Sequence, residues 1–325
     1  MPTASRIVSL LPSATEMVFA LGLGDNLVGV THGCDYPPEV RSKPAVVRNA
    51  LAIETMSQRE IDTAVSERLR QGLSLYEIDT GLVEQLAPDL IITQSLCDVC
   101  APSANEMQGL LSSLTKKPEV LWMTPRTLGE VAGNILDLGI AANREATAER
   151  LVAEGQTRIR RIADTARSLA QRPRVFCMEW LDPVYCSGHW IPEMVRIGGG
   201  IDGLGREGAD SVRVPWDDVL RWAPEVLIFM PCGYGLERAV EQSHALAALP
   251  GFAELPAVRN ACVFAVDAND YFARPGPRVV ECTELMAHLV HPDTFDWSGP
   301  ADAYCRLSVC SRPAVRSAVA ARSGC

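Results

Sequence analysis

Four of the eleven cysteines follow short apolar segments of the kind that form buried strands. Two of them make a Cys-x-x-Cys pair, and the other two occur independently, far away along the chain. Because thiolates crowded at one point repel each other unless a cation holds them, such a group favours zinc, copper(I) or an iron–sulfur cluster. The predicted metal ligands are Cys34, Cys97, Cys100 and Cys232, with His32 and His189 as candidate further ligands.

The pair Cys97 and Cys100 permits two other interpretations. A helix that begins just after the pair would lower the pKa of a nearby thiol, as in dithiol redox proteins. In a chain with eleven cysteines, a chance pair is also reasonable, because Cys177, Cys262 and Cys282 already lie within strand or helix patterns typical of core residues. Metal binding, redox chemistry and simple burial therefore stay open for this pair.

Aromatic and polar residues gather after the predicted strands. In open parallel sheets, ligands bind beyond the carboxyl ends of the strands. The segments that follow these ends are 32–36 and 94–100 in the first half of the chain, and 179–180, 232–234 and 270–272 in the second. If the two halves face each other, these segments line one cleft that is rich in aromatic rings and thiols and poor in Lys and Arg.

Short apolar runs alternate with helical patterns, which is typical of α/β proteins with parallel strands. The expected strands are 7–11, 27–30, 90–93, 120–123, 174–178, 226–230 and 263–266. The expected helices are a first one opened by Pro12, then 58–71, 82–86, 143–172, 191–197, 216–221 and 278–289. Ser13 and Glu16 have the spacing of a capping box at the first helix. The segment 143–172 contains no proline and predicts one long helix.

The same local pattern occurs once in each half of the chain. Residues 85–92 and 220–228 both combine a helix end, an Ala-Pro-acid turn and a strand. We therefore predict an α/β fold of two Rossmann-like lobes with parallel sheets, joined by one long backbone helix. The predicted divisions are a first lobe at 1–142, the connecting helix at 143–172, a second lobe at 173–292 and a tail at 293–325.

The composition is that of a globular protein. Hydrophobic residues make up 47% of the chain, and 30 Lys and Arg against 40 Asp and Glu give a net charge of −10, which argues against nucleic acid as the main partner. No apolar run is long enough to cross a membrane, and the N-terminus lacks the pattern of a secretory signal, so we expect a cytoplasmic protein. The sequence contains no serine-hydrolase, zinc-protease or P-loop motif.

Several segments together resemble the vitamin B12-binding proteins of ABC importers. These proteins belong to the helical-backbone class of substrate-binding proteins, which also bind ferric siderophores and haem. The segments that carry the resemblance are 6–16, 28–30, 35–38, 87–92, 187–188, 198–200, 213–216 and 270–278. Their order and spacing match over most of the chain, so the resemblance is specific at the level of fold.

The resemblance implies a ligand that is held between two lobes without undergoing chemistry. The expected ligand is cobalamin or a related corrinoid or metal chelate, because flat aromatic side chains suit the broad, partly apolar face of a corrin ring. The stiff connecting helix implies only modest hinge motion. Carried onto this chain, the ligand-binding residues are Tyr36, Trp180, Tyr185, Trp216, Asp270, Tyr271 and Phe272.

The chain also departs from those proteins. The acidic residue with which their first lobe docks falls near Gly81 here, which puts docking on an ABC transporter in doubt. Residues 56–76 form an insertion without a counterpart in the B12 binders, and the four thiols are foreign to their pattern. We therefore predict a cytoplasmic, non-catalytic cobalamin or metal-chelate binder. The alternatives are a cytoplasmic metalloprotein with an iron–sulfur cluster or zinc, and a thiol-redox protein.

Overall fold

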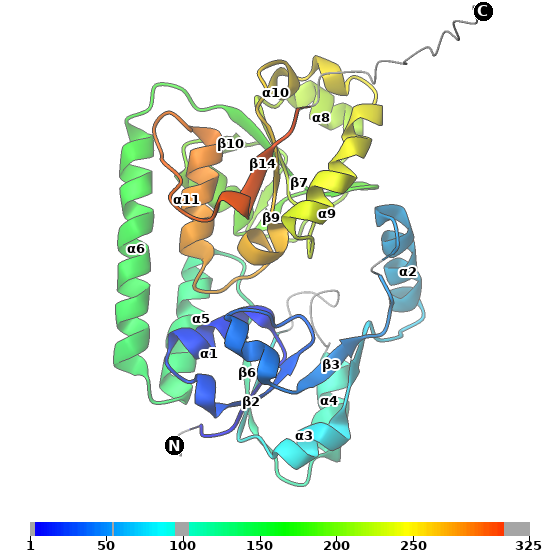
Figure 1. Cartoon of the computed structure of the whole chain (residues 1–325), viewed down its shortest axis with the longest axis vertical. Helices are drawn as coiled ribbons and strands as arrows, with labels where there is room; N and C mark the ends of the chain where they lie inside the picture. Colours follow the sequence, from blue (N-terminus) through cyan, green and yellow to red (C-terminus); the bar gives the residue numbers. More distant parts are fainter. Residues whose placement is uncertain (1–3, 54, 95–103, 309–325) are drawn as a thin grey trace, which may run out of the picture.

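The computed structural model describes residues 4–53, 55–94 and 104–308 and shows two α/β lobes joined by helix α6 (Glu145–Arg167) (Figure 1). This arrangement confirms the predicted fold class. The 23 residues of α6 span about 34 Å, and the helix runs along one side of both lobes. It is shorter than predicted at both ends. The preceding helix α5 (Leu128–Ala141), which the sequence analysis missed, ends where Asn143 takes a left-handed backbone conformation with φ 53°, and α6 itself ends at the C-cap Ser168.

The first lobe is built on a six-stranded sheet in the order β4-β3-β2-β1-β5-β6. All neighbours are parallel except β4, which pairs antiparallel with β3 at the edge. The strands are β1 (Ile7–Ser9), β2 (Leu27–Thr31), β3 (Ala45–Asn49), β4 (Tyr76–Ile78), β5 (Leu90–Thr93) and β6 (Glu119–Trp122). The helices of this lobe are α1 (Pro12–Ala20), α3 (Thr80–Leu86), α4 (Ala104–Ser113) and α5. Strand β5 is buried along its whole length, as expected of an inner strand covered on both faces.

The second lobe repeats this design around the order β10-β7-β12-β13-β14, with β8 paired to β7. Its strands are β7 (Arg174–Leu181), β8 (Val184–Cys186), β9 (Gly188–His189), β10 (Ile201–Asp202), β11 (Arg206–Glu207), β12 (Val226–Phe229), β13 (Val263–Val266) and β14 (Tyr304–Arg306). Its helices are α7 (Ile191–Ile197), α8 (Trp216–Trp222), α9 (Leu236–Ser243), α10 (Pro256–Arg259) and α11 (Val279–Val290). The predicted tail thus contributes β14, which pairs antiparallel with β13.

The two lobes share one hydrophobic core. A single cluster of buried side chains includes Leu11 and Met123 of the first lobe, Ala148 of α6, and Trp190 and Phe272 of the second lobe. Each lobe has a further cluster of its own. The lobes are therefore packed against each other near α6. None of the helices in the described ranges has the length and apolar character needed to cross a lipid bilayer.

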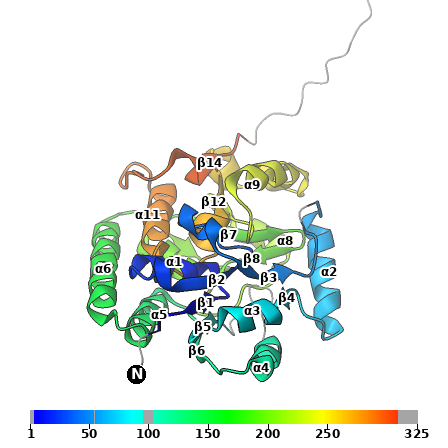
Figure 2. The ribbon, with the colours of Figure 1, turned by 60° about the horizontal axis from the view of Figure 1, so that its bottom comes forward.

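The insertion predicted at 56–76 forms an arm that leaves the edge of the first sheet. The arm, residues 50–75, connects β3 to β4 and carries helix α2 (Gln58–Arg70). Ser57 and Glu60 close a capping box at the start of α2. In Figures 1 and 2, α2 lies on the side of the molecule opposite α6. We call this segment the α2 arm.

The capping box predicted for α1 is wrong. The helix begins with Pro12 after Leu11, and no side chain caps it. Glu16 is instead almost fully buried and faces the second lobe, where it accepts hydrogen bonds from Arg278. The Ser-x-x-Glu spacing predicted a cap that does not form, because Arg278 of the second lobe binds the Glu16 carboxylate instead.

Candidate functional site

The carboxyl ends of the strands in the two sheets face each other. The loop after β2 carries Asp35, and the segment after β13 carries Asn269 and Arg274. Across the lobes, the Asn269 amide lies 3.4 Å from a carboxylate oxygen of Asp35, and Arg274 donates to the carbonyl of Gly33 at 3.2 Å. We call the region between these facing loops the interlobe site. The topology therefore places it where ligands of parallel sheets bind.

Two arginines of the second lobe and two carboxylates of the first form what we call the interlobe ion cluster. Arg274 reaches Asp35 at 2.6 Å and Glu16 at 3.2 Å, and Arg278 makes two hydrogen bonds to Glu16 at 2.9 and 2.6 Å. Asp270 lies 3.7 Å from Arg278 and adds a third carboxylate. Glu16 and Arg274 are almost completely shielded from solvent, with 2% and 5% of their side chains exposed.

The environment of this cluster shifts its pKa values in favour of charge. Burial opposes ionisation of Asp35, but the hydrogen bond and the charge of Arg274 outweigh it and lower the pKa of that carboxyl. Burial likewise opposes the charge of Arg274 and Arg278, yet their carboxylate partners raise both pKa values. The shifts of Asp35, Arg274 and Arg278 therefore all favour the charged form, and these charges hold the lobes together.

A close approach between two backbone segments explains how Arg274 and Arg278 reach the first lobe. They flank the turn Pro275-Gly276-Pro277, which lies against the start of α1. A Cβ atom at Gly276 would come within 3.3 Å of the carbonyl oxygen of Ser13. Glycine therefore lets the turn carrying both arginines approach α1.

Of the predicted ligand-binding residues, Tyr36 and Asp270 lie at the ion cluster. Tyr36 is 44% exposed, and the guanidinium of Arg278 lies 4.2 Å from the centre of its ring. This is cation–π geometry. The Asp270 backbone N–H donates to the side chain of Asp267 at 2.8 Å, which fixes the helical turn that follows β13. An exposed ring beside a fixed cation gives a flat, half-apolar contact surface.

Trp180 and Tyr185 lie under the α2 arm. The Trp180 indole donates to the backbone carbonyl of Gln58 at 3.2 Å, and its ring meets Tyr234 edge-on with centroids 5.5 Å apart. The Tyr185 hydroxyl accepts a hydrogen bond from Arg213 at 3.1 Å. Both rings are therefore near the facing loops, but the arm contacts Trp180 directly.

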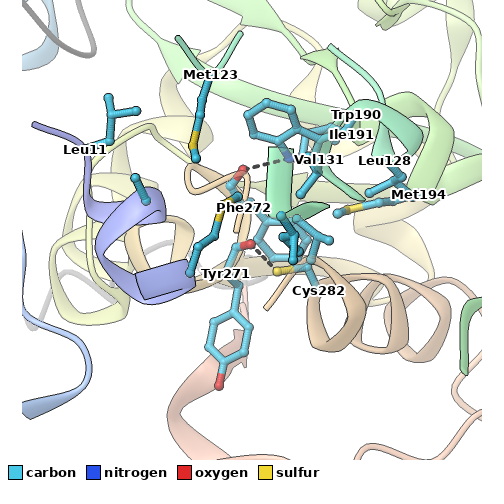
Figure 3. Close-up of a cluster of buried hydrophobic side chains, with 14 of the residues drawn as sticks. Leu11, Met123, Leu128, Val131, Trp190, Ile191, Met194, Tyr271, Phe272 and Cys282 are labelled. Atoms are coloured by element: carbon cyan, nitrogen blue, oxygen red, sulfur yellow. Dashed lines mark hydrogen bonds between the residues drawn. The ribbon is translucent and has the colours of Figure 1, made fainter. Parts of the chain in front are cut away.

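The remaining predicted ligand residues are held within the second lobe. Tyr271 and Phe272 are 8% and 3% exposed and belong to the core cluster drawn in Figure 3, where the Trp190 indole donates to the Phe272 carbonyl at 3.2 Å. Trp216 donates to the carbonyl of Pro250 at 2.6 Å. In this conformation, the Phe272 ring is enclosed by the core and does not face a ligand.

The thiols give no support for a metal centre. Cys34 is buried, its sulfur lies 3.1 Å from the Thr15 hydroxyl, and burial raises the pKa of its thiol to about 11, which disfavours the thiolate. Cys232 is exposed in the loop after β12. Cys97 and Cys100 lie outside the described residues. Within residues 4–53, 55–94 and 104–308, no three His, Cys, Asp or Glu side chains are grouped to hold a metal ion.

The two candidate histidine ligands have local partners. His32 Nδ1 lies 3.2 Å from the carbonyl of Val47. His189 Nε2 lies 3.2 Å from a carboxylate oxygen of Asp210, and burial outweighs that carboxylate, so the pKa of the ring is lowered. These contacts anchor both rings within their own lobes.

A cavity of about 770 Å³ lies between α6 and the two lobes. This volume is in the range of small-molecule pockets. Its walls come from α1, α5, α6, α7 and α11, and among the predicted ligand residues only Tyr36 lines it. Glu16 and Arg278 also line it, so the ion cluster separates this cavity from the facing loops.

Sequence reasoning missed the residues that join the lobes. Arg274 and Arg278 were within a segment that carried the family resemblance, but no role was assigned to them. The signal that could have revealed them is a carboxylate, Glu16, inside an otherwise apolar helix, because such a charge needs a buried partner. The contacts of the α2 arm left no comparable signal.

Comparison with known proteins gives a consistent result. Residues 7–269 match the family described as periplasmic binding protein. A vitamin B12-binding protein of Vibrio cholerae is 28% identical over 285 residues, which is 87% of this chain and 88% of the relative. An uncharacterized ABC transporter substrate-binding lipoprotein of Bacillus subtilis, YvrC, is 25% identical over 89% of this chain and 81% of its own length.

The fold is also found in a solved structure. The crystal structure of the periplasmic vitamin B12 binding protein BtuF of Vibrio cholerae superposes with a TM-score of 0.64 and 25% identity. The match covers 88% of this chain and 96% of that protein. Both lobes and the connecting helix are therefore shared with that structure.

Proposed function

The chain belongs to the periplasmic binding protein family, and on that premise we propose that it holds cobalamin or a related metal chelate between its two lobes, without catalysis. A substrate-binding role follows from the family. The identity of the ligand is supported by the Vibrio cholerae relative, which is named a vitamin B12-binding protein and matches over most of both chains.

The geometry of the interlobe site supports a large, flat ligand. Tyr36 presents an exposed ring, and the charged groups beside it are already paired with each other. A small charged ligand would have to compete with those ion pairs, whereas a broad and partly apolar ligand can stack on the ring without breaking them. The exposed Tyr36 ring beside charges that are already paired therefore favours a chelate with an extended ring system.

We also propose an ABC transporter as the partner that receives the ligand. The Bacillus subtilis relative is named a transporter substrate-binding lipoprotein. The doubt raised by Gly81 weakens, because exposed carboxylates flank it: Asp79 caps α3, and Glu84 lies one turn further along the same helix. Pull-down with the detergent-solubilised transporter, comparing Asp79→Asn and Glu84→Gln with the unmodified chain, would test this pairing.

Isothermal titration with cyanocobalamin, and with haemin as a second chelate, tests the binding proposal. One-to-one binding of cyanocobalamin is expected, and haemin reports whether the site selects the corrin ring. If neither compound binds, the proposal fails. Replacement Tyr36→Ala should weaken binding by about 1–3 kcal/mol, the range of an aromatic anchor at an interface.

Trp222→Phe provides the matched aromatic control. The Trp222 indole donates to the carbonyl of Val175, at the amino end of β7 and away from the facing loops. Its replacement should leave the dissociation constant unchanged. Equal effects of Tyr36→Ala and Trp222→Phe would mean that both act through the fold and would remove Tyr36 from the site.

A further inference from the structure

The α2 arm crosses from the first lobe to the second on the side opposite α6 (Figures 1 and 2). We infer that the arm is a clasp on the interlobe site, and that ligand enters and leaves only after the arm has released the second lobe. This inference rests on the proposed binding function and names how that site is regulated. It follows from four sets of contacts between the arm and the carboxyl edge of the second sheet.

Two arginine–aspartate pairs cross between the lobes. Arg59 of α2 binds Asp182, in the turn between β7 and β8, through two parallel hydrogen bonds of 2.8 and 2.7 Å. Asp62, one turn further along α2, accepts from Arg213 at 3.0 and 2.8 Å. The charges are reversed between the pairs, so the arm and its docking surface each carry one positive and one negative partner. This alternation fixes the register of the helix on the second lobe.

Gln58 makes a buried polar contact between the arm and the second lobe. Its side-chain oxygen accepts a hydrogen bond of 2.6 Å from the backbone N–H of Leu181, at the end of β7. Its backbone carbonyl accepts the indole N–H of Trp180. The Gln58 Nε2, however, has no hydrogen-bond partner among the described residues. An unsatisfied buried donor makes the closed arm less favourable than a fully satisfied interface, which suits an element that must open.

A fourth contact ties the base of the arm to α9. Arg238 donates to the carbonyls of Ile53 and Met56 at 3.1 and 3.2 Å, while its guanidinium lies 4.0 Å from the centre of the Tyr234 ring. These bonds are made to backbone oxygens, so they do not depend on which side chains the arm carries. Release of the second lobe therefore requires these two hydrogen bonds to break as well as the ion pairs.

The clasp covers rings that a ligand would use. Trp180 is hydrogen-bonded to the arm, and Tyr185 is linked to it through Arg213. Three of the four ion-pair side chains are well exposed, with 74%, 42% and 56% of Arg59, Asp182 and Arg213 accessible to solvent. Exposed pairs of this kind are weak and screened by salt. The ion pairs of the closed arm are therefore interactions that ionic strength can weaken.

Hydrogen–deuterium exchange of the ligand-free protein tests the closed arm. In the double variant Asp62→Asn/Asp182→Asn, exchange of the α2 amides should accelerate by about five- to tenfold, while α6 stays unchanged. Asp62→Arg should open the arm by repelling Arg213, and Asp62→Arg/Arg213→Asp should restore protection. Glu67→Gln is the control, because the ion pair that Glu67 makes among the described residues is with Arg70 of the same helix, at 3.9 Å. Equal exchange in all variants would overturn the clasp.

Stopped-flow displacement of bound cyanocobalamin tests its effect on the site. Dissociation should be several-fold faster in Asp62→Arg, return towards the original rate in the charge-swapped variant, and stay unaltered in Glu67→Gln. If cyanocobalamin binds but all dissociation rates are equal, the arm does not gate the site and the inference fails. If neither cyanocobalamin nor haemin binds, the proposed function fails, and the exchange experiment still decides whether the arm closes.

Discussion

Two of the ion-pair bridges between the lobes, the interlobe ion cluster and the pairs of the α2 arm, differ in burial. The interlobe ion cluster buries Glu16 and Arg274 between the lobes, whereas the ion pairs of the α2 arm lie at the surface. Removing one partner of a buried pair leaves an uncompensated charge and costs about 3–5 kcal/mol. Removing one partner of an exposed pair costs about 0.2–1 kcal/mol. Arginine–carboxylate pairs are therefore expected to hold the lobes together stably where they are buried, and to break and re-form where they are exposed.

Arg274→Met should give the largest effect. It leaves Asp35 without its arginine and Glu16 with one arginine instead of two. Global stability in urea denaturation should fall by about 3–5 kcal/mol. Arg167→Met is the control, because within the part of the chain that the structure describes Arg167 pairs with Asp164 alone, on the surface of α6. This variant should cost less than about 0.5 kcal/mol. Similar losses in both variants would abolish the contrast between the two bridges.

Gln58→Met should give the next largest effect, and it should be local. The side chain keeps its length, but the buried N–H of Leu181 loses its acceptor, which costs about 1–3 kcal/mol. We expect faster amide exchange in α2 with little change in the urea midpoint of the whole chain. A lowered urea midpoint with unchanged amide exchange in α2 would instead mean that Gln58 stabilises the whole fold and not the closed arm.

The pH dependence of Asp35 should be smaller still. Its folded pKa is lowered, so its contribution to stability is present above the unfolded pKa of about 3.9 and is lost as the pH falls through the folded value. At pH 7, Asp35→Asn should cost about 1 kcal/mol, because more than a third of the side chain is exposed and its interaction is screened. Below the folded pKa of Asp35 the two proteins should converge. A difference that grows on acidification would contradict the assignment.

Asp182→Asn should give the smallest effect. Loss of the pair with Arg59 should increase α2 exchange by about twofold, corresponding to roughly 0.5 kcal/mol. Salt near 1 M, where the Debye length is about 3 Å, should produce a similar increase in the unmodified chain and little further increase in the variant. Salt sensitivity that is equal in both would show that this pair contributes nothing to closure.

The fold was predictable because its signals are local. Short apolar runs gave β5 and β13 with their observed limits, and the absence of proline placed the connecting helix around α6. The helix at 58–71 was also found nearly as observed in α2. Strands β3 and β4 were missed, because their alternation is short and their pairing forms the edge of a sheet.

The site was less predictable because its contacts are made between distant parts of the chain. Arg274 and Glu16 are separated by 258 positions, and Gln58 and Leu181 by 123. The aromatic residues after β13 were expected in the site, but Phe272 packs into the shared core instead. Local pattern indicates that a ring follows a strand, whereas packing of the other lobe decides whether that ring is buried.

The hydrophobic core that passes through both lobes has a consequence for how the protein loses its structure. Because Leu11, Ala148 and Phe272 belong to one buried cluster, melting of either lobe would expose apolar surface of the other. Heating should therefore produce a single cooperative transition in calorimetry. A fragment that contains only one lobe should aggregate, since it would carry the uncovered half of that cluster into water.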